Sequence, residues 1–377
     1  MKENQLSANP VMLLSDLKGA SEYIDSLFDR FEIYGKLVLE TSEGKHSGLT
    51  LMLPSIKAKV FAVSNVSNHV TLVEIPHPIF RPFRFYKSII NAFKSEEWNP
   101  STFILAHPYK SFFLIQAIQL ISRRKFRFQV QFHGHIFEKP RHGNILASAK
   151  YCSLMNSVRS ADSVRFASQV LLDDFKAKAN LGEINSLVAP IPIDFSKIPA
   201  RRMPIPFTVG VIGRMQEERG VQDALEIALA VVREQPRAKF IFVGDGPMKK
   251  EIRNFLDSKI ELSSSKLEHF LDNESLQACY SELSALLSCA PSEGYGLTIR
   301  EAALSGIRVL ARQSQGADIA AQEFPEQIQI YSQPEEAVSK LISILDSNQV
   351  ATGLAEARLN QANRDLESSI RLVRSWI

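Results

Sequence analysis

The chain has 377 residues, a length that predicts two domains rather than one compact core. Its composition, 45% hydrophobic and 23% charged, is ordinary for a globular protein, and no uncharged apolar run approaches the ~20 residues needed to span a bilayer. The net charge of +3 is too weak a basic bias for a nucleic-acid-binding protein, so we expect no nucleic-acid partner.

Along the chain, short apolar runs alternate with amphipathic stretches, which is typical of a parallel α/β architecture. In the first half, helical spacing predicts helices at 21–31 and 111–123, and apolar runs predict strands at 11–15, 36–41, 58–63, 102–107, 126–132 and 163–168. In the second half we expect strands at 207–215, 239–247, 285–291 and 308–312, with a charge-rich helix from about 350 to 376.

The basic residues of the first half gather in two stretches, where they alternate with aromatic residues. These stretches are RPFRFYKSIINAFK (81–94) and RRKFRF (123–128). Such a pattern suits anionic lipid headgroups or a phosphorylated acceptor. The alternative is a solvated face whose charges guard a hydrophobic strand against aggregation.

Prolines crowd the middle of the chain, with five of them between residues 190 and 206. A stiff connection between domains explains them better than a regular element does. We therefore expect an N-terminal domain at 1–196, a linker at 197–206, a C-terminal domain at 207–350, and a terminal helix at 351–377 that packs back on the first domain. Two such α/β halves predict a ligand cleft between them.

The first candidate site is the stretch VGVIGRMQEERG (209–220), in which a buried strand ends at Gly213 and is followed by Arg214 and Arg219. Ligands of open parallel sheets bind at the carboxyl ends of the strands, and arginine donates a bidentate pair of hydrogen bonds to phosphate. The alternative is that the two arginines pair on the surface with Glu217 and Glu218.

The second candidate site is PSEGYGLTIREAALSG (291–306), in which Glu293 and Glu301 flank a glycine turn. We expect Thr298 to cap a helix that starts in this turn and stops at Gly306. A glycine turn at a helix N-terminus offers free N–H groups to an anion, and a carboxylate suits the adjacent hydroxyls of a sugar. The alternative for Glu301 is an ordinary helix residue.

Other motifs are weaker. His133 and His135 flank a glycine after the strand at 126–132, where they suit a ligand, but no third residue stands nearby to complete a metal site. VGDGP (243–247) predicts a tight turn. The sequence has neither a phosphate-binding loop of the Walker type nor an Asp-x-Asp metal clamp, and its three scattered cysteines match no metal or disulfide spacing. We expect no metal and no cofactor.

The order of these motifs closely resembles the C-terminal half of the retaining glycosyltransferases of family 4, over roughly residues 207–345. The hallmark of that family is a glutamate, seven residues and a second glutamate, here Glu293 and Glu301. The resemblance implies the GT-B fold, an α/β fold of two facing Rossmann-like domains with parallel sheets and a cleft between them. The N-terminal half is less similar, and of the glycine pair expected after the first strand only Gly19 is present.

The resemblance also implies roles for individual residues. Arg214 and Arg219 would bind the donor diphosphate beside Gly213, with Arg219 where the family usually has lysine. Glu301 would bind the ribose, and Glu293 would contact the transferred sugar. The phosphate would lie along the turn and helix start formed by Gly294, Tyr295, Gly296, Leu297 and Thr298.

His133 would lie near the reacting centre, and the acceptor side would involve Gly19. The implied activity is metal-independent, retaining transfer of a hexosyl group from a nucleoside diphosphate sugar to an acceptor hydroxyl. The acceptor would be a glycan or a lipid-linked molecule, as in polysaccharide, lipopolysaccharide or glycolipid synthesis.

Two other functions stay open. They are a non-catalytic subunit that binds a nucleotide sugar, and an epimerase or phosphorylase on the same architecture. The expected location is the cytoplasm, because the N-terminus lacks the apolar stretch of a signal peptide. A peripheral contact with the inner face of an anionic membrane is compatible with this location.

Overall fold

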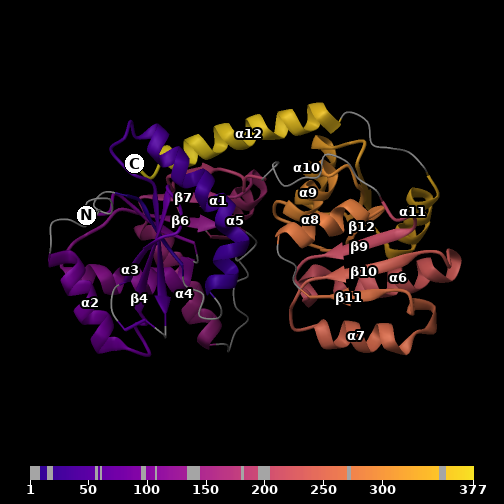
Figure 1. Ribbon diagram of the computed structural model, residues 1–377, viewed down its shortest axis with the longest axis horizontal. Helices are drawn as coiled ribbons and strands as arrows, with labels where there is room; N and C mark the ends of the chain where they lie inside the picture. Colours follow the sequence, from indigo (N-terminus) through magenta and orange to yellow (C-terminus); the bar gives the residue numbers. More distant parts are fainter. Residues whose placement is uncertain are drawn as a thin grey trace. The chain divides into compact units, whose positions relative to one another are not determined.

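In the computed structural model, the described residues are 9–14, 20–55, 58–59, 62–94, 99–106, 108–133, 145–179, 182–193, 204–269, 273–347 and 354–377. The chain divides into two compact units (Figure 1). Unit 1 comprises Met1–Pro192 and Asp365–Ile377, and unit 2 comprises Ile193–Arg364. Of the predicted linker at 197–206, only 204–206 are among the described residues.

Unit 1 is built on an eight-stranded sheet with the order β3-β4-β2-β1-β5-β6-β7-β8, parallel except for β3. Its strands are β1 (Val11–Leu13), β2 (Leu49–Ser55), β3 (Ala62–Asn65), β4 (Val70–Pro76), β5 (Phe103–Leu105), β6 (Phe128–Phe132), β7 (Ser163–Phe166) and β8 (Ser186–Val188). Its helices are α1 (Ala20–Thr41), α2 (Pro82–Lys94), α3 (Pro108–Ser122), α4 (Ile145–Ser160) and α5 (Gln169–Ala179).

Two hydrophobic clusters cover the two faces of this sheet. Helices α2, α3, α4 and α5 pack on one face, and α1 packs on the other. The end of α12 (Leu354–Arg374) and the residues after it join the α1 face through Leu372, Val373 and Trp376. The indole N–H of Trp376 donates a 2.8 Å hydrogen bond to Gln129 of β6, which ties the C-terminus to the sheet.

Unit 2 is built on a six-stranded parallel sheet with the order β11-β10-β9-β12-β13-β14. Its strands are β9 (Thr208–Ile212), β10 (Lys239–Val243), β11 (Lys266–Glu268), β12 (Ala285–Ser288), β13 (Arg308–Arg312) and β14 (Ile328–Tyr331). Its helices are α6 (Val221–Glu234), α7 (Lys249–Ser258), α8 (Asn273–Glu282), α9 (Leu297–Leu304), α10 (Gln315–Glu323) and α11 (Pro334–Asp346), with 3-10 turns η3 (Glu217–Arg219) and η4 (Ile260–Leu262).

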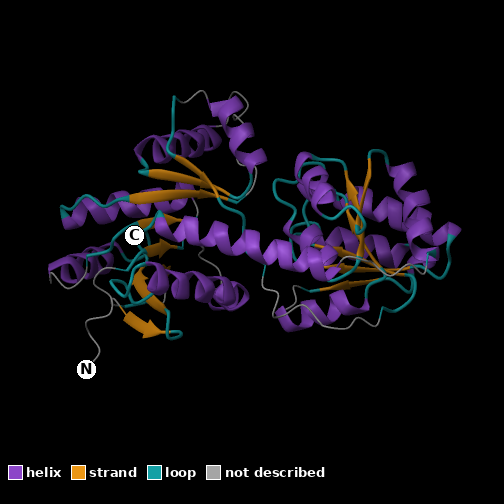
Figure 2. Ribbon diagram, turned by 90° about the horizontal axis from the view of Figure 1, so that it is seen from above, coloured by secondary structure: helices purple, strands orange, loops and turns teal. Residues whose placement is uncertain are grey.

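Helices α6 to α11 form two layers around the sheet of unit 2 (Figures 1 and 2). Helices α6, α7 and α11 pack on one face, and α8, α9 and α10 pack on the other. Because a parallel sheet with both faces covered needs strands that are apolar on both sides, consecutive residues in the middle of β9, β10, β12 and β13 are buried. The predicted α/β class with two Rossmann-like units is therefore confirmed.

Some predicted elements are wrong. The apolar run at 36–41 is the end of α1, not a strand, because Phe31, Tyr34, Leu37 and Val38 recur at helical spacing and are all buried on one face. The three cysteines are free: Cys152 is exposed, Cys279 is half-buried and Cys289 is buried. None of the helices in the described part of the chain combines the length and the hydrophobicity that a membrane span requires.

Candidate functional site

The order of strands in unit 2 creates a switch point between β9 and β12. These two strands are neighbours in the sheet. After β9 the chain continues to β10 on one side of the pair, and after β12 it continues to β13 on the other side. The helix after β9, α6, lies on one face, and the helix after β12, α9, lies on the opposite face. Loops diverge at such a point and leave room for a ligand at the carboxyl ends of the strands.

Two predicted site residues meet at this switch point. Arg219 Nη1, from the segment after β9, lies 2.7 Å from Glu293 Oε2, from the segment after β12. The Glu293 side chain is 15% exposed and that of Arg219 37% exposed, so both remain within reach of a ligand. Arg219 thus pairs with Glu293 and not with its neighbours Glu217 and Glu218, which are exposed.

Gly220 explains how Arg219 reaches the end of β12. It adopts a left-handed conformation (φ 66°) between η3 and α6, and a Cβ there would lie 2.0 Å from the carbonyl oxygen of Cys289. Only glycine allows the two backbones to approach so closely. The predicted diphosphate partner Arg214 lies earlier in the same segment and is exposed.

The glycines after β9 and β10 hold those two strand ends together. Gly213 N–H donates to the Val243 carbonyl (3.0 Å), and a Cβ on Gly244 would lie 1.8 Å from the Gly213 carbonyl oxygen. Gly246 approaches Met215 in the same way. The VGDGP turn is therefore a close contact between loops that supports the backbone around Gly213.

The turn after Glu293 leads into α9 through Gly296, which is the N-cap residue in a left-handed conformation (φ 73°) with no side-chain cap. Thr298 was expected to cap this helix, and that expectation is wrong, because the helix begins one residue earlier, at Leu297. A helix start without a side-chain cap leaves backbone N–H groups for a ligand. The beginning of this turn is connected to α10, because the N–H of Gly316 in the first turn of that helix donates to the Glu293 carbonyl (3.0 Å).

A buried arginine of α9 connects the turn to α10. Arg300 is 2% exposed, and its Nε and Nη2 bind Glu323 of α10 at 3.0 and 2.9 Å. Its guanidinium carbon lies 4.2 Å from the centre of the Tyr295 ring, a cation–π contact. Tyr295 therefore packs inward, which leaves the backbone of the turn, rather than this side chain, to face a ligand.

Glu301 lies on α9, one turn after its start, and contacts a buried tyrosine. The hydroxyl of Tyr280, on α8, donates to Glu301 Oε2 at 3.4 Å. Burial, and then the Glu301 charge, raise the pKa of Tyr280 well above its usual value, so the hydroxyl stays protonated and can only donate to the carboxylate. Tyr280 therefore orients Glu301.

The predicted residues of unit 1 are placed less fully. His133 directly follows β6, at the carboxyl end of that strand, and is exposed. Gly19 and His135 lie outside the described residues. Within the part of the chain that is described, no group of three or more metal-ligating side chains comes together.

Three residues that matter to this geometry, Tyr280, Arg300 and Gly316, were not identified from the sequence. Tyr280 belongs to a short helix with no motif of its own. The sequence does signal Gly316, since it follows the strand at 308–312 in SQGAD, as a helix N-terminus would. Arg300 looks like a solvated helix residue, and only the packing of Glu323 and Tyr295 around it shows that it is buried.

Comparison with known proteins shows what the second half of the chain resembles. Residues 206–347 match the family model described as glycosyl transferases group 1. Among characterised relatives, alpha-monoglucosyldiacylglycerol synthase of Acholeplasma laidlawii is 24% identical over 150 residues, 40% of this chain and 37% of that protein. Sulfoquinovosyl transferase SQD2 of Arabidopsis thaliana is 24% identical over 38% of this chain and 28% of that protein. The chain thus spans about a third of the length of these relatives.

Two of the similar solved structures match nearly the whole chain. HepE of Anabaena, in complex with UDP and glucose, has a TM-score of 0.69 at 15% identity and covers 97% of this chain and 98% of its own. Sucrose-phosphate synthase of Thermosynechococcus elongatus has a TM-score of 0.63 at 14% identity, with 98% and 94% covered. These likenesses establish the GT-B class of fold, and residues 206–347 are similar in sequence to the glycosyl transferases group 1 family.

Proposed function

We propose that this protein is a retaining glycosyltransferase that moves a sugar from a nucleoside diphosphate sugar to an acceptor hydroxyl. The observation that carries the proposal is the meeting of Arg219 and Glu293 at the switch point of unit 2, beside the uncapped start of α9. This arrangement offers a cation and backbone N–H groups to a diphosphate, and a carboxylate to sugar hydroxyls, within one small region.

The costly event in such a transfer is departure of the nucleoside diphosphate, which gathers negative charge on its oxygens. Arg214, Arg219 and the first N–H groups of α9 are the donors that would stabilise that charge in the transition state. Glu301, oriented by Tyr280, would accept hydrogen bonds from the ribose hydroxyls. Glu293 would bind the transferred sugar, and the resemblance assigns His133 to the same sugar.

The proposed reaction exchanges one bond at the anomeric carbon for another on the same face of the sugar. The bond to the diphosphate oxygen breaks, the acceptor oxygen forms the new bond, and the acceptor proton passes to the departing diphosphate. The donors on the chain replace the charge that a metal would supply. Activity is therefore expected to be unchanged when EDTA is present, and loss of activity that Mg²⁺ restores would contradict metal independence.

Several comparisons support a nucleotide sugar as donor and a glycan or lipid-linked acceptor. The structure of HepE contains UDP and glucose, and two of the related proteins are named as a glucosyldiacylglycerol synthase and a sulfoquinovosyl transferase. A hexose donor and a hydroxyl on a glycolipid or glycan precursor are the matching substrate classes for this chain.

The direct test is to incubate the protein with UDP-glucose, UDP-galactose, UDP-N-acetylglucosamine and GDP-mannose, with no acceptor, and to measure free nucleoside diphosphate. Retaining transferases that lack an acceptor can pass the sugar slowly to water, so release from one donor is expected, and Arg219→Ala should abolish it. If a donor binds but none of the four is hydrolysed, the result favours a non-catalytic subunit. Conversion into an isomeric donor would instead indicate an epimerase.

A further inference from the structure

Helix α2 of unit 1 presents an apolar face to solvent. Its inward face packs into the core through Phe85, Ile89 and Phe93. On the other side, the side chains of Phe83 and Tyr86 are 78% and 51% exposed. A solvent-facing helix surface is normally polar, so these two aromatic residues call for an explanation.

The turn before α2 extends this apolar face. Ile79 is 78% exposed and Phe80 is 60% exposed. The turn is held in place by buried His77, whose Nδ1 accepts hydrogen bonds from the backbone N–H groups of Ile79 (3.2 Å) and Phe80 (3.3 Å). The backbone that carries these two exposed side chains is therefore held by a buried group.

The same surface is basic. Arg84 and Lys87 are exposed between the aromatic residues of α2, Arg81 is half-buried just before the helix, and Lys59 is exposed. The sequence from Ile75 to Lys94 contains no aspartate or glutamate. Cations with apolar stems beside exposed aromatic rings are typical of a helix that lies at the interface of a bilayer.

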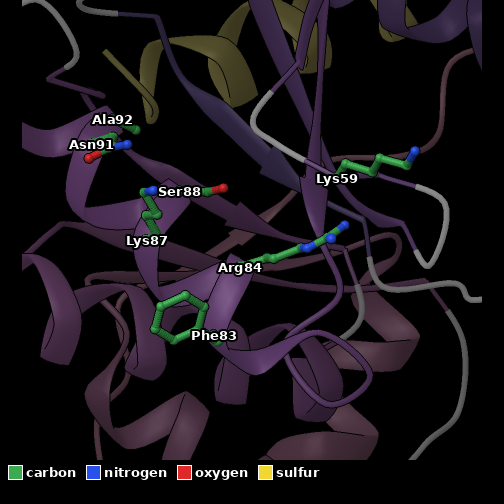
Figure 3. Close-up of a pocket in the computed structure, with 7 residues that line it drawn as sticks. All are labelled: Lys59, Phe83, Arg84, Lys87, Ser88, Asn91 and Ala92. Atoms are coloured by element: carbon green, nitrogen blue, oxygen red, sulfur yellow. The ribbon is translucent and has the colours of Figure 1, made fainter.

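A cavity of ≈ 830 Å³ opens on this surface (Figure 3). Its lining comes from Lys59 and from α2: Phe83, Arg84, Lys87, Ser88, Asn91 and Ala92. Figure 3 shows the Arg84 side chain extended towards the segment that carries Lys59. Three cations with a hydroxyl and an amide form a suitable lining for a phosphate group, and a cavity of this size can hold a lipid headgroup.

We propose that the α2 surface, formed by Ile79, Phe80, Phe83, Arg84, Tyr86, Lys87 and Lys59, docks on a bilayer of anionic phospholipid. The cavity beside α2 takes a headgroup phosphate, and the four apolar side chains enter the boundary between headgroups and acyl chains. Charge complementarity selects this partner, because an apolar protein partner would leave the cations of the same face unpaired. The proposal concerns unit 1 alone and does not depend on the donor chemistry of unit 2.

The test is flotation of the purified protein with vesicles of phosphatidylcholine alone and with vesicles that contain phosphatidylglycerol. We expect binding to the anionic vesicles only, weakened by salt. Because each cation near an anionic surface contributes about 1 kcal/mol, the double variant Arg84→Ser, Lys87→Ser should bind about thirty-fold more weakly. Phe83→Ser should also weaken binding, since it removes an aromatic ring from the interface.

The matched control is Lys250→Ser with Arg253→Ser, which removes the same charge from exposed positions on α7 of unit 2. It should bind vesicles as the wild type does, and thermal unfolding of every variant checks that each is folded. Equal binding by the α2 variant, an equal loss in the control, or no preference for phosphatidylglycerol would overturn the proposal. A different occupant of the α2 surface would also overturn it. In that case the wild type would not bind vesicles but would self-associate, as detected by light scattering, and Phe83→Ser would abolish the self-association.

Discussion

Arg219 and Glu293 are 74 residues apart in the sequence, and their side chains meet at 2.7 Å where β9 and β12 diverge. The pair joins two loops that belong to opposite sides of the topological switch in unit 2. The carboxylate therefore holds the arginine close to the start of α9, where we propose that a diphosphate binds. In the proposed complex, Arg219 would contact the diphosphate and Glu293 the transferred sugar of the same donor.

Replacement of Arg219 tests the diphosphate assignment. Arg219→Ala removes a preorganised donor, so kcat should fall by roughly 10²–10³-fold. Arg219→Lys keeps the charge and introduces lysine, the usual residue at this position in the family that the sequence resembles. It should therefore retain much more activity than Arg219→Ala. Steady-state kinetics with the preferred donor measures both variants, and an unchanged kcat/KM for Arg219→Ala would contradict the assignment.

Replacement of Glu301 tests the ribose assignment by a binding measurement. Because hydrogen bonds to a charged group contribute about 1.5–3 kcal/mol, Glu301→Ala should weaken nucleoside diphosphate binding by roughly ten- to a hundred-fold. Tyr280→Phe removes only the hydroxyl that orients the carboxylate and should weaken binding by about five-fold. Isothermal titration calorimetry measures both affinities.

The control for Tyr280 is Tyr34→Phe in unit 1, because the buried Tyr34 hydroxyl has no hydrogen-bond partner within the described part of the chain. This variant should bind the nucleotide as the wild type does. Equal affinities in wild type and Glu301→Ala would show that the ribose lies elsewhere.

Gly220 tests how the fold brings Arg219 to the site. In Gly220→Ala the new Cβ would meet the Cys289 carbonyl oxygen at 2.0 Å, and alanine disfavours φ 66°. We expect the free energy of unfolding to drop by at least about 2 kcal/mol, with weaker nucleotide binding as the loop moves. Gly182→Ala is the control, since a Cβ there meets nothing within 4 Å. Chemical denaturation of the two variants should differ clearly, and equal stability would contradict the close approach.

His77 predicts a pH dependence of stability. Burial lowers its pKa below the usual 6.5, and its Nδ1 accepts two backbone hydrogen bonds, so the fold favours the neutral ring. Its contribution is fully present above pH 6.5 and is lost as the pH falls from 6.5 towards the lower pKa of the folded state, because the unfolded chain takes up the proton first. His77→Gln should flatten this part of the stability profile. The measurement is chemical denaturation at pH values between 5 and 8, spaced about one pH unit apart. An identical slope in both proteins would contradict it.

The sequence predicts unit 2 well because its central strands are buried on both faces and end in glycine turns. β9, β10, β12 and β13 all lie within their predicted ranges. The edge strands β11 and β14 were missed, since a strand that is partly exposed lacks the continuous apolar run. In unit 1 the end of α1 was predicted as a strand, because a short apolar run has no periodicity of its own to separate the two structures.

The candidate site was predicted in part. The sequence indicates which residues could bind a diphosphate, because Arg219 and Glu293 belong to motifs at strand ends. It does not show that the two side chains meet, since that depends on Gly220 lying against the Cys289 carbonyl. Tyr280 and Arg300 act through tertiary packing between α8, α9 and α10, and no local pattern carries that information.

The central claim is that a nucleoside diphosphate binds at the switch point between β9 and β12. A thermal-shift panel of UDP, GDP, ADP, CDP and dTDP tests it most directly, because a ligand that binds the folded state raises the melting temperature by mass action. We predict that one nucleotide raises the melting temperature of the wild type and has little effect on Glu301→Ala or Arg219→Ala. A panel in which no nucleotide stabilises the wild type, or in which both variants respond as the wild type does, would contradict the account.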